Sequence, residues 1–454
     1  MRGGEKVGEL FGTDGVRGEA NQYLTPELAF KLGKAGAYFL TQNEKEAKIL
    51  IGKDTRVSGD MLESALIAGI TALGIDVVKV GVVPTPVVAY LSKTEAVSAG
   101  IMISASHNPV QDNGIKFFNA NGFKLSDDEE EEIEDIIFNS LAELPTVAGD
   151  EVGRVEYRHD SLSAYADYIK KTIDNNLAGL KIVIDAANGA TYELSPQVFS
   201  DLGAELITLN NQPNGYNINQ NCGSTHPQDL QQAVIKHNAD LGIAHDGDGD
   251  RVIAVDETGE LIDGDYILAI CGRELIKEGE LEQNTIVATK YSNLGLQNSL
   301  QEVDGKVAIT KNGDRYVLAE MLEKGYVLGG EKSGHIIFLE HNTTGDGLLT
   351  ALQLADVMKK RGEKLSELKQ VMTELPQVLV NVRVDDKDWQ ENEAINDAIA
   401  KVEAELKGEG RIFVRASGTE PVIRVMLEGR DEVELKEMAN DVAEVIKEQL
   451  IVDS

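Results

Sequence analysis

The densest group of residues able to do chemistry is the loop at residues 246–250, DGDGD, which Arg251 follows. Carboxylates at alternate positions of an extended loop point to one side, and the two glycines let the loop turn tightly. Hard oxygen donors suit Mg²⁺ or Ca²⁺, and three like charges this close repel one another unless a cation is present. An EF-hand is excluded, because its sixth position requires glycine and holds Arg251 here, and because strand-like runs flank the loop. The pattern predicts a divalent-metal site rather than a plain polar turn.

A second candidate site is the segment 104–109, SASHNP, at the end of an apolar run. A hydroxyl displayed at the end of a strand beside an imidazole is a candidate nucleophile, and open α/β sheets place ligands at such strand ends. A turn that caps its own backbone fits the same residues equally well. The spacing does not choose between Ser104 and Ser106 as the nucleophile.

Two further loops carry polar groups of other kinds. In the segment 330–335, GEKSGH, a carboxylate and a hydroxyl between glycines can bind sugar hydroxyls, and the imidazole can move protons near neutral pH. A glycine-rich polar turn is the competing interpretation. The segment 415–421, RASGTEP, with Arg424 beyond it, combines hydroxyls, backbone N–H groups and guanidinium groups, which together can cradle a phosphate. A hairpin with surface arginines would have the same pattern.

Two N-terminal segments add to these loops. The glycine-rich segment 11–18, FGTDGVRG, ends near Arg17, a charge that could neutralise a phosphoryl group during transfer. The segment 52–56, GKDTR, follows a strand-like run. Either segment could instead be purely structural.

The elements that position these loops alternate between short apolar runs and helix-like segments. Nearly continuous apolar runs are typical of strands buried on both faces of a parallel sheet, and repeated strand–helix alternation indicates α/β layers. The expected strands cover residues 47–52, 76–83, 99–105, 181–186, 205–210, 239–244, 251–256 and 284–289, and the expected helices include 26–40 and 61–73. Ser126 and Glu129 predict a capping box at the start of an acidic helix. The tail, with strands at 379–384, 411–416 and 422–429 and helices at 392–406 and 433–450, predicts a small α+β domain.

We expect domains at residues 1–155, 156–255, 256–372 and 373–454, with a linker in 143–160. The first would carry the segment 104–109, called the serine loop, and the second the segment 246–250, called the metal loop. The third would carry the segment 330–335, called the sugar loop, and the last the segment 415–421, called the phosphate loop.

Composition narrows the possible partners and location. The chain has 454 residues, of which 42% are hydrophobic and 26% charged, and its formal net charge is −34. A field of this sign repels phosphate backbones and anionic lipids, so neither nucleic acid nor a membrane surface is expected as a partner. No run of 18 apolar residues and no leader-like apolar segment is present. With only Cys222 and Cys271, the sequence predicts a cytoplasmic protein without a disulfide framework.

The chemistry-bearing segments also occur in a known order. Taken together, they resemble the α-D-phosphohexomutase superfamily, and within it most closely the bacterial phosphoglucosamine mutases. The motifs are FGTDGVRG (11–18), ISASHNP (103–109), DNGIKFF (112–118), DGDGDR (246–251), GGEKSGH (329–335) and RASGTEP (415–421). The resemblance implies three α/β domains with mixed or parallel sheets and a smaller C-terminal α+β domain around a central cleft.

The implied activity is the interconversion of glucosamine 6-phosphate and glucosamine 1-phosphate through a phosphoserine and a bound 1,6-bisphosphate. This reaction feeds UDP-N-acetylglucosamine and cell-wall precursor synthesis. A phosphomannomutase or phosphoglucomutase of the same superfamily is the alternative. A non-catalytic sensor on the same scaffold is disfavoured, because no motif lacks its serine or aspartates. Family analogy also implies a possible homodimer that binds a small hexosamine phosphate.

The resemblance assigns roles to individual residues. Ser106, directly before His107, would bear the phosphoryl group. One Mg²⁺ would be held by Ser106 with Asp246, Asp248 and Asp250. The residues that act at the reacting end would be Arg17, Ser106, His107, Lys116, Arg251 and His335, with either Lys116 or His335 as the base. Substrate-binding residues would be Glu331, Ser333, Arg415, Ser417, Gly418, Thr419 and Arg424. Lys332 departs from the family motif, which usually has glutamine there. This basic residue could shift the preference between amino and neutral sugars, or it could simply point to solvent.

Overall fold

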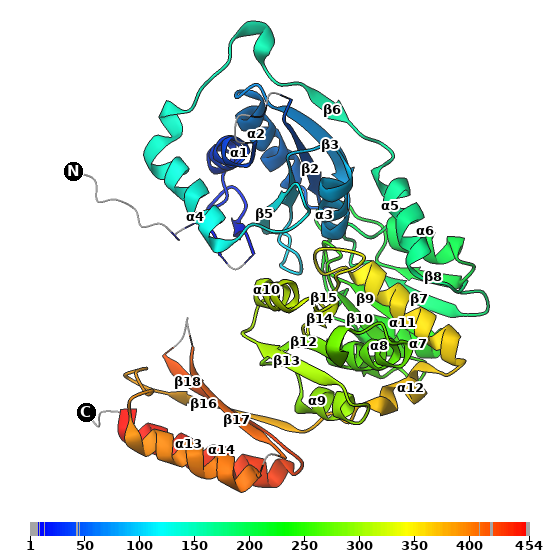
Figure 1. The fold of residues 1–454 in the computed structure, drawn as a ribbon, viewed down its shortest axis with the longest axis vertical. Coiled ribbons are helices and arrows are strands. Elements are labelled where there is room, and N and C mark those ends of the chain that lie inside the picture. Colours follow the sequence, from blue (N-terminus) through cyan, green and yellow to red (C-terminus); the bar gives the residue numbers. More distant parts are fainter. Residues whose placement is uncertain are drawn as a thin grey trace. The chain divides into compact units, whose positions relative to one another are not determined.

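The computed structural model describes residues 8, 10–12, 14–41, 44, 46–407, 409–417 and 421–450. The chain forms two compact units. The first comprises Met1–Tyr291 with Val303–Val371, and the second comprises Ser292–Glu302 with Met372–Ser454. Among the described residues, three sheets lie in the first unit and one in the second (Figure 1). No helix of the described residues is both long and apolar enough to cross a membrane.

The first sheet has six strands in the order β1-β5-β4-β2-β3-β6. Its strands are β1 (Val16–Glu19), β2 (Lys48–Lys53), β3 (Asp76–Val82), β4 (Ala99–Ile103), β5 (Asp112–Asn119) and β6 (Val155–Tyr157). Helices α1 (Pro26–Thr41), α2 (Gly59–Thr71) and α4 (Asp127–Asp135) share one apolar core with a face of this sheet. Helix α3 (Thr85–Thr94) packs on β2 and β4, where Val88 lies against Gly52 and Gly100. The predicted capping box is confirmed, because the Ser126 and Glu129 side chains each accept the other residue's backbone N–H.

The second sheet has five strands in the order β11-β10-β9-β7-β8. Its strands are β7 (Lys181–Asp185), β8 (Glu205–Leu209), β9 (Leu241–His245), β10 (Val252–Asp256) and β11 (Leu261–Ile262). Helix α7 (Gln228–His237) covers one face with an apolar core of its own, and α5 (Ser161–Ile169) and α6 (Leu194–Asp201) precede it. Strands β9 and β10 pair antiparallel, so the 246–251 loop is the turn of a hairpin.

The third sheet has four strands in the order β13-β12-β14-β15. Its strands are β12 (Thr285–Thr289), β13 (Lys306–Thr310), β14 (Leu328–Gly330) and β15 (Ile336–Phe338). The helices of this part are α8 (Gly264–Glu278), α10 (Asp314–Lys324), α11 (Gly347–Arg361) and α12 (Leu365–Leu368). The predicted sugar loop connects β14 to β15. Single helical turns lie at η1 (Ile136–Ser140), η2 (Leu141–Glu143), η3 (Gly149–Glu151), η4 (Lys170–Thr172), η5 (Glu282–Asn284) and η6 (Lys369–Val371).

The second unit is the small α+β fold that the tail predicts. Its antiparallel sheet has the order β16-β18-β17, with β16 (Gln377–Arg383), β17 (Arg411–Ala416) and β18 (Val422–Glu428). Helices α13 (Glu393–Leu406) and α14 (Glu432–Leu450) bury one apolar core against the sheet. Helix α9 (Leu294–Gln301) joins this unit, because the Leu294 backbone N–H donates to the Glu428 carboxylate at 2.7 Å.

The three sheets of the first unit are mixed, in agreement with the expected mixed or parallel sheets, since β5, β10 and β15 run antiparallel to their neighbours. One expectation differs from the structure. Within the expected linker, β6 pairs with β3. All three residues of β6 are exposed at the sheet edge, so no apolar run revealed this strand.

Candidate active site

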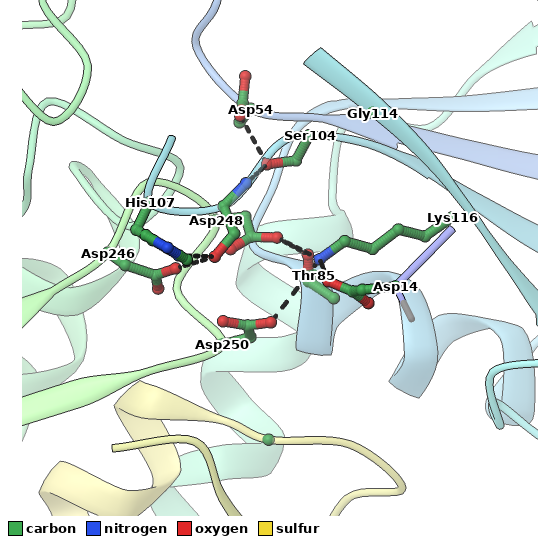
Figure 2. A network of polar contacts seen from close by, with 12 residues as sticks. Asp14, Asp54, Thr85, Ser104, His107, Gly114, Lys116, Asp246, Asp248 and Asp250 are labelled. Atoms are coloured by element: carbon green, nitrogen blue, oxygen red, sulfur yellow. Dashed lines mark hydrogen bonds and ion pairs between the residues drawn. The ribbon is translucent and has the colours of Figure 1, made fainter. Parts of the chain in front are cut away.

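Ser106 lies just beyond the end of β4, in a left-handed backbone conformation with φ of 51°. Its hydroxyl is buried and donates to Asp246 Oδ2 at 2.5 Å, and His107 Nδ1 lies 3.3 Å from the same oxygen. Ser104 faces elsewhere, because its hydroxyl donates to Asp54 at 2.6 Å (Figure 2). The structure therefore brings Ser106, and not Ser104, to the acidic loop.

The hairpin between β9 and β10 places Asp246, Asp248 and Asp250 together. All three are buried, and one oxygen of each lies within 4.8 Å of the others (Figure 2). One oxygen of Asp248 and one of Asp250 accept no hydrogen bond from the described residues. Buried carboxylate oxygens without a donor are costly. A divalent cation with oxygen preference fits this donor set.

Lys116, from β5, is the buried cation beside this trio. Its Nζ lies 2.9 Å from Asp248, 3.2 Å from Asp14 and 3.7 Å from Asp250 (Figure 2). Burial alone would lower the pKa of Lys116, but these carboxylates raise it above its usual value, so the side chain stays charged. Thr85, at the start of α3, donates a further hydrogen bond to Asp248 at 2.7 Å.

The surroundings shift the pKa values of the three aspartates in different directions. Burial and the neighbouring charges of Asp250 and Asp248 raise the pKa of Asp246 well above its usual range. Burial also opposes ionisation of Asp250, but Lys116 and His335 hold its pKa well below that range. A proton or another cation at Asp246 therefore stabilises the resting site.

The site continues from Asp14 and His335 as a chain of alternating charges. Asp14 pairs with Arg17 and, at 2.6 Å, with Lys124, whose ammonium also pairs with Asp314. His335 Nδ1 lies 3.5 Å from Asp250 Oδ2, and its Nε2 lies 3.6 Å from Asp314 Oδ2. Both candidate bases, Lys116 and His335, therefore face the Asp250 carboxylate.

Comparison with known proteins places this geometry in a family. Phosphoglucomutase/phosphomannomutase models match the chain at residues 8–143 (alpha/beta/alpha domain I), 163–259 (domain II), 263–375 (domain III) and 379–445 (C-terminal domain). Phosphoglucosamine mutase from Desulforamulus reducens is 54% identical over 97% of this chain and 99% of its own length, and that from Clostridium novyi is 53% identical over 98% and 99%. The chain belongs to the phosphoglucosamine mutase family. A phosphoglucomutase/phosphomannomutase family protein from Burkholderia thailandensis has the same fold, with a TM-score of 0.80 and 26% identity over 97% of both chains.

In this member of the family, hydrogen bonds to the Glu331 carboxylate hold the predicted sugar loop. Glu331 accepts the Gly313 backbone N–H at 3.1 Å and the Ser333 hydroxyl at 3.3 Å, and Ser333 is exposed. Lys332, the departure from the family motif, lies 3.6 Å from Asp263, which caps α8. Its ammonium therefore interacts within the protein beside the loop.

The predicted phosphate loop belongs to the second unit. Arg415 and Arg424 are opposite one another on β17 and β18, and the Ser417 backbone N–H donates to Val422 at 2.9 Å. Lys387 donates to the Ser417 carbonyl at 2.9 Å and adds a cation that the sequence had not indicated. Like charges at opposed strand positions favour an anion or carboxylates near them. The predicted members Gly418 and Thr419 lie outside the described residues.

Several residues around the site were missed by sequence reasoning. Each of them binds a partner that is far away in the sequence. These residues are Asp14, Thr85, Lys124 and Asp314. Asp14 stands within the FGTDGVRG motif, which is the one signal that could have identified it. The other three carry no local pattern.

Proposed function

We propose that this enzyme, an isomerase that transfers a phosphoryl group within its substrate, interconverts glucosamine 6-phosphate and glucosamine 1-phosphate. The reaction would supply UDP-N-acetylglucosamine and cell-wall precursor synthesis in the cytoplasm. The observation that carries the proposal is the buried Ser106 hydroxyl, 2.5 Å from the first of three clustered aspartates. Relatives named phosphoglucosamine mutase, more than half identical over nearly the whole chain, support the choice of sugar.

In the proposed reaction, Ser106 carries a phosphoryl group and donates it to O1 of glucosamine 6-phosphate. The bond from phosphorus to the serine oxygen breaks, a bond from phosphorus to O1 forms, and the O1 proton passes to a base. After the bound 1,6-bisphosphate turns over, the Ser106 oxygen forms a bond to the 6-phosphorus. The bond from that phosphorus to O6 breaks and O6 takes a proton, which leaves glucosamine 1-phosphate and the phosphorylated enzyme. Mg²⁺ held by the aspartate trio and the serine would withdraw charge from the seryl phosphate.

The chain's own charges account for the remaining requirements of phosphoryl transfer, which are positioning and neutralisation. Lys116 is held as a cation beside Asp248, and Arg17 is held by Asp14, so both can neutralise phosphoryl oxygens. Because Lys116 is held as a charged ammonium, it cannot accept a proton until it loses its own, so His335 is the favoured one of the two candidate bases to take the hydroxyl proton. His107 and Arg251 complete the reacting end, and Glu331 with Ser333 binds the sugar hydroxyls.

The non-reacting phosphate would be bound by the loop of the second unit. Its proposed ligands combine guanidinium groups, hydroxyls and a backbone N–H group, and they are Arg415, Ser417, Gly418, Thr419 and Arg424.

A substrate panel with a nucleophile variant tests the proposal. We expect conversion of glucosamine 6-phosphate to exceed that of glucose and mannose 6-phosphates, to stop with chelator and to return with Mg²⁺. Ser106→Ala should abolish turnover and the phosphate detected on the protein by mass spectrometry. Ser64→Ala, an exposed serine on α2, should retain both. Turnover in Ser106→Ala would overturn the nucleophile, and a preference for mannose or glucose would favour the phosphomannomutase or phosphoglucomutase alternative.

A further inference from the structure

The segment 52–56, singled out in the sequence, has no part in the proposed reaction, yet its arginine lies directly beneath the serine loop. Arg56 is buried with 3% of its surface exposed, and Asn219 approaches the same loop from the second sheet's part of the chain. We propose that Arg56 and Asn219 are positioning residues that hold Ser106 in its left-handed conformation, with its hydroxyl facing the aspartates. This inference rests on the proposed role of Ser106 as nucleophile.

Arg56 satisfies four backbone carbonyls of the serine loop with one guanidinium group. Its Nη2 donates to the Ser106 carbonyl at 2.9 Å and to the Asn108 carbonyl at 2.8 Å. Its Nη1 donates to the Asp112 carbonyl at 3.0 Å and also to that of Pro109. The planar fork therefore fixes residues 106–112 as one closed loop, which a lysine ammonium lacks the geometry to do.

The backbone N–H of Ser106 is held by the same network. Arg56 Nε donates to Asp54 Oδ2 at 2.8 Å, and the Ser104 hydroxyl donates to the same oxygen at 2.6 Å. The Ser106 N–H in turn donates to the Ser104 hydroxyl at 2.9 Å. Ser104, the other candidate in the sequence, thus serves as an acceptor that orients Ser106.

Asn219 donates to two of the carbonyls that Arg56 also binds. Its Nδ2 donates to the Ser106 carbonyl at 2.8 Å and to the Asn108 carbonyl at 3.0 Å, and its own N–H donates to Ala187 at 2.9 Å. Asn219 is buried and has a positive φ of 56°, a conformation that asparagine tolerates better than most residues.

These contacts stabilise the unfavourable left-handed backbone conformation of Ser106. Left-handed backbone is unfavourable for any residue with a Cβ, and it persists only where the surroundings impose it. Without these two donors to its carbonyl, Ser106 would relax toward an ordinary conformation, which would turn its hydroxyl away from Asp246. Contacts that place the nucleophile, without touching substrate, should influence kcat more than KM.

Two substitutions at Asn219 separate a donor role from simple packing. Asn219→Ala removes the donor, whereas Asn219→Asp keeps the shape and places a carboxylate against two carbonyls. We expect kcat to fall by about 10–100-fold in Asn219→Ala and further in Asn219→Asp, with KM changed less than about threefold. Asn214→Ala, an exposed asparagine in the same loop, should behave as wild type. Arg56→Lys, which keeps the charge, should also lower kcat.

The assay is steady-state conversion of glucosamine 6-phosphate, together with single-turnover transfer from the phosphorylated enzyme and thermal unfolding of each variant. If Asn219→Asp transfers as fast as wild type, or faster than Asn219→Ala, the donor role is overturned. If the wild-type enzyme converts none of the three sugar phosphates, the proposed function itself fails. The two failures are therefore distinguishable.

Discussion

Gly247 offers a sharp test of how tightly the metal loop and the serine loop must approach. It separates the first two aspartates of the trio. A Cβ at this position would lie 2.5 Å from the Ser106 carbonyl oxygen and 2.8 Å from Asn219 Nδ2. Ordinary contact begins near 3.4 Å, so in Gly247→Ala the carbonyl would have to withdraw by about 0.9 Å (3.4 minus 2.5).

The magnitude follows from this displacement. Forcing one extra methyl group into a packed site costs about 1–3 kcal/mol of unfolding free energy. A shift of about 1 Å between a nucleophile and its partners costs about 100-fold in rate. We therefore expect Gly247→Ala to lower kcat by about 100-fold, measured as initial conversion of glucosamine 6-phosphate at saturating Mg²⁺, and to unfold at lower urea concentration.

Gly59→Ala is the matched control. Gly59 is the first residue of α2, and a Cβ there would meet only the flexible Lys53 side chain at 3.4 Å. This variant should retain wild-type kcat and lose no stability. If Gly247→Ala keeps kcat within about threefold of wild type, the close approach of the two loops is not needed for the reaction and the reasoning is refuted.

Three further outcomes are expected. Lys116→Met should lower the free energy of unfolding by about 3–5 kcal/mol in the absence of metal, because the substitution leaves buried carboxylates unpaired. Urea unfolding with and without Mg²⁺ measures this loss, and an unchanged unfolding midpoint would contradict the prediction. Burial lowers the pKa of His245 from 6.5 to about 4, so the unfolded chain binds this proton first as pH falls. Stability should therefore decrease between pH 6.5 and about 4 by about 3 kcal/mol in total, and His245→Asn should show a flatter slope while exposed His226→Asn does not. Burial raises the thiol pKa of both Cys222 and Cys271 to about 12, so neither should react with Ellman's reagent until the protein unfolds; rapid labelling of the native protein would speak against the structure.

The parts of the site that the sequence predicted are those built from neighbouring residues. The aspartate loop follows one apolar run and enters another, so its place at the turn between β9 and β10 could be expected. The serine segment similarly ends an apolar run that forms β4. Local composition also predicted the acidic helix, because its capping box depends on residues three positions apart.

Convergence over long sequence distances could not be predicted in this way. Lys124 reaches Asp14 across 110 positions and Asp314 across 190, and no local pattern indicates either contact. The structure distinguishes Ser104 from Ser106 by the partner of each hydroxyl, which is Asp54 for Ser104 and Asp246 for Ser106, and spacing does not encode these contacts. The resemblance supplied the choice of Ser106 as nucleophile, which stays a prediction. The expected domain limits and the roles of individual site residues stay predictions.

The acidic character of the chain and an anionic substrate are compatible because charge acts here over short distances. Each cation of the reacting end is held by a carboxylate, as Lys116 is by Asp248 and Arg17 is by Asp14. Fixed pairs of this kind keep positive charge in a buried site without requiring a basic surface. Beyond about 10 Å, salt screens the field of the remaining acidic groups, so a small phosphate entering the site meets the local cations first. A long polyanion would instead contact many acidic surface groups at once. The same net charge of −34 that argues against nucleic acid therefore leaves a sugar phosphate as a suitable ligand.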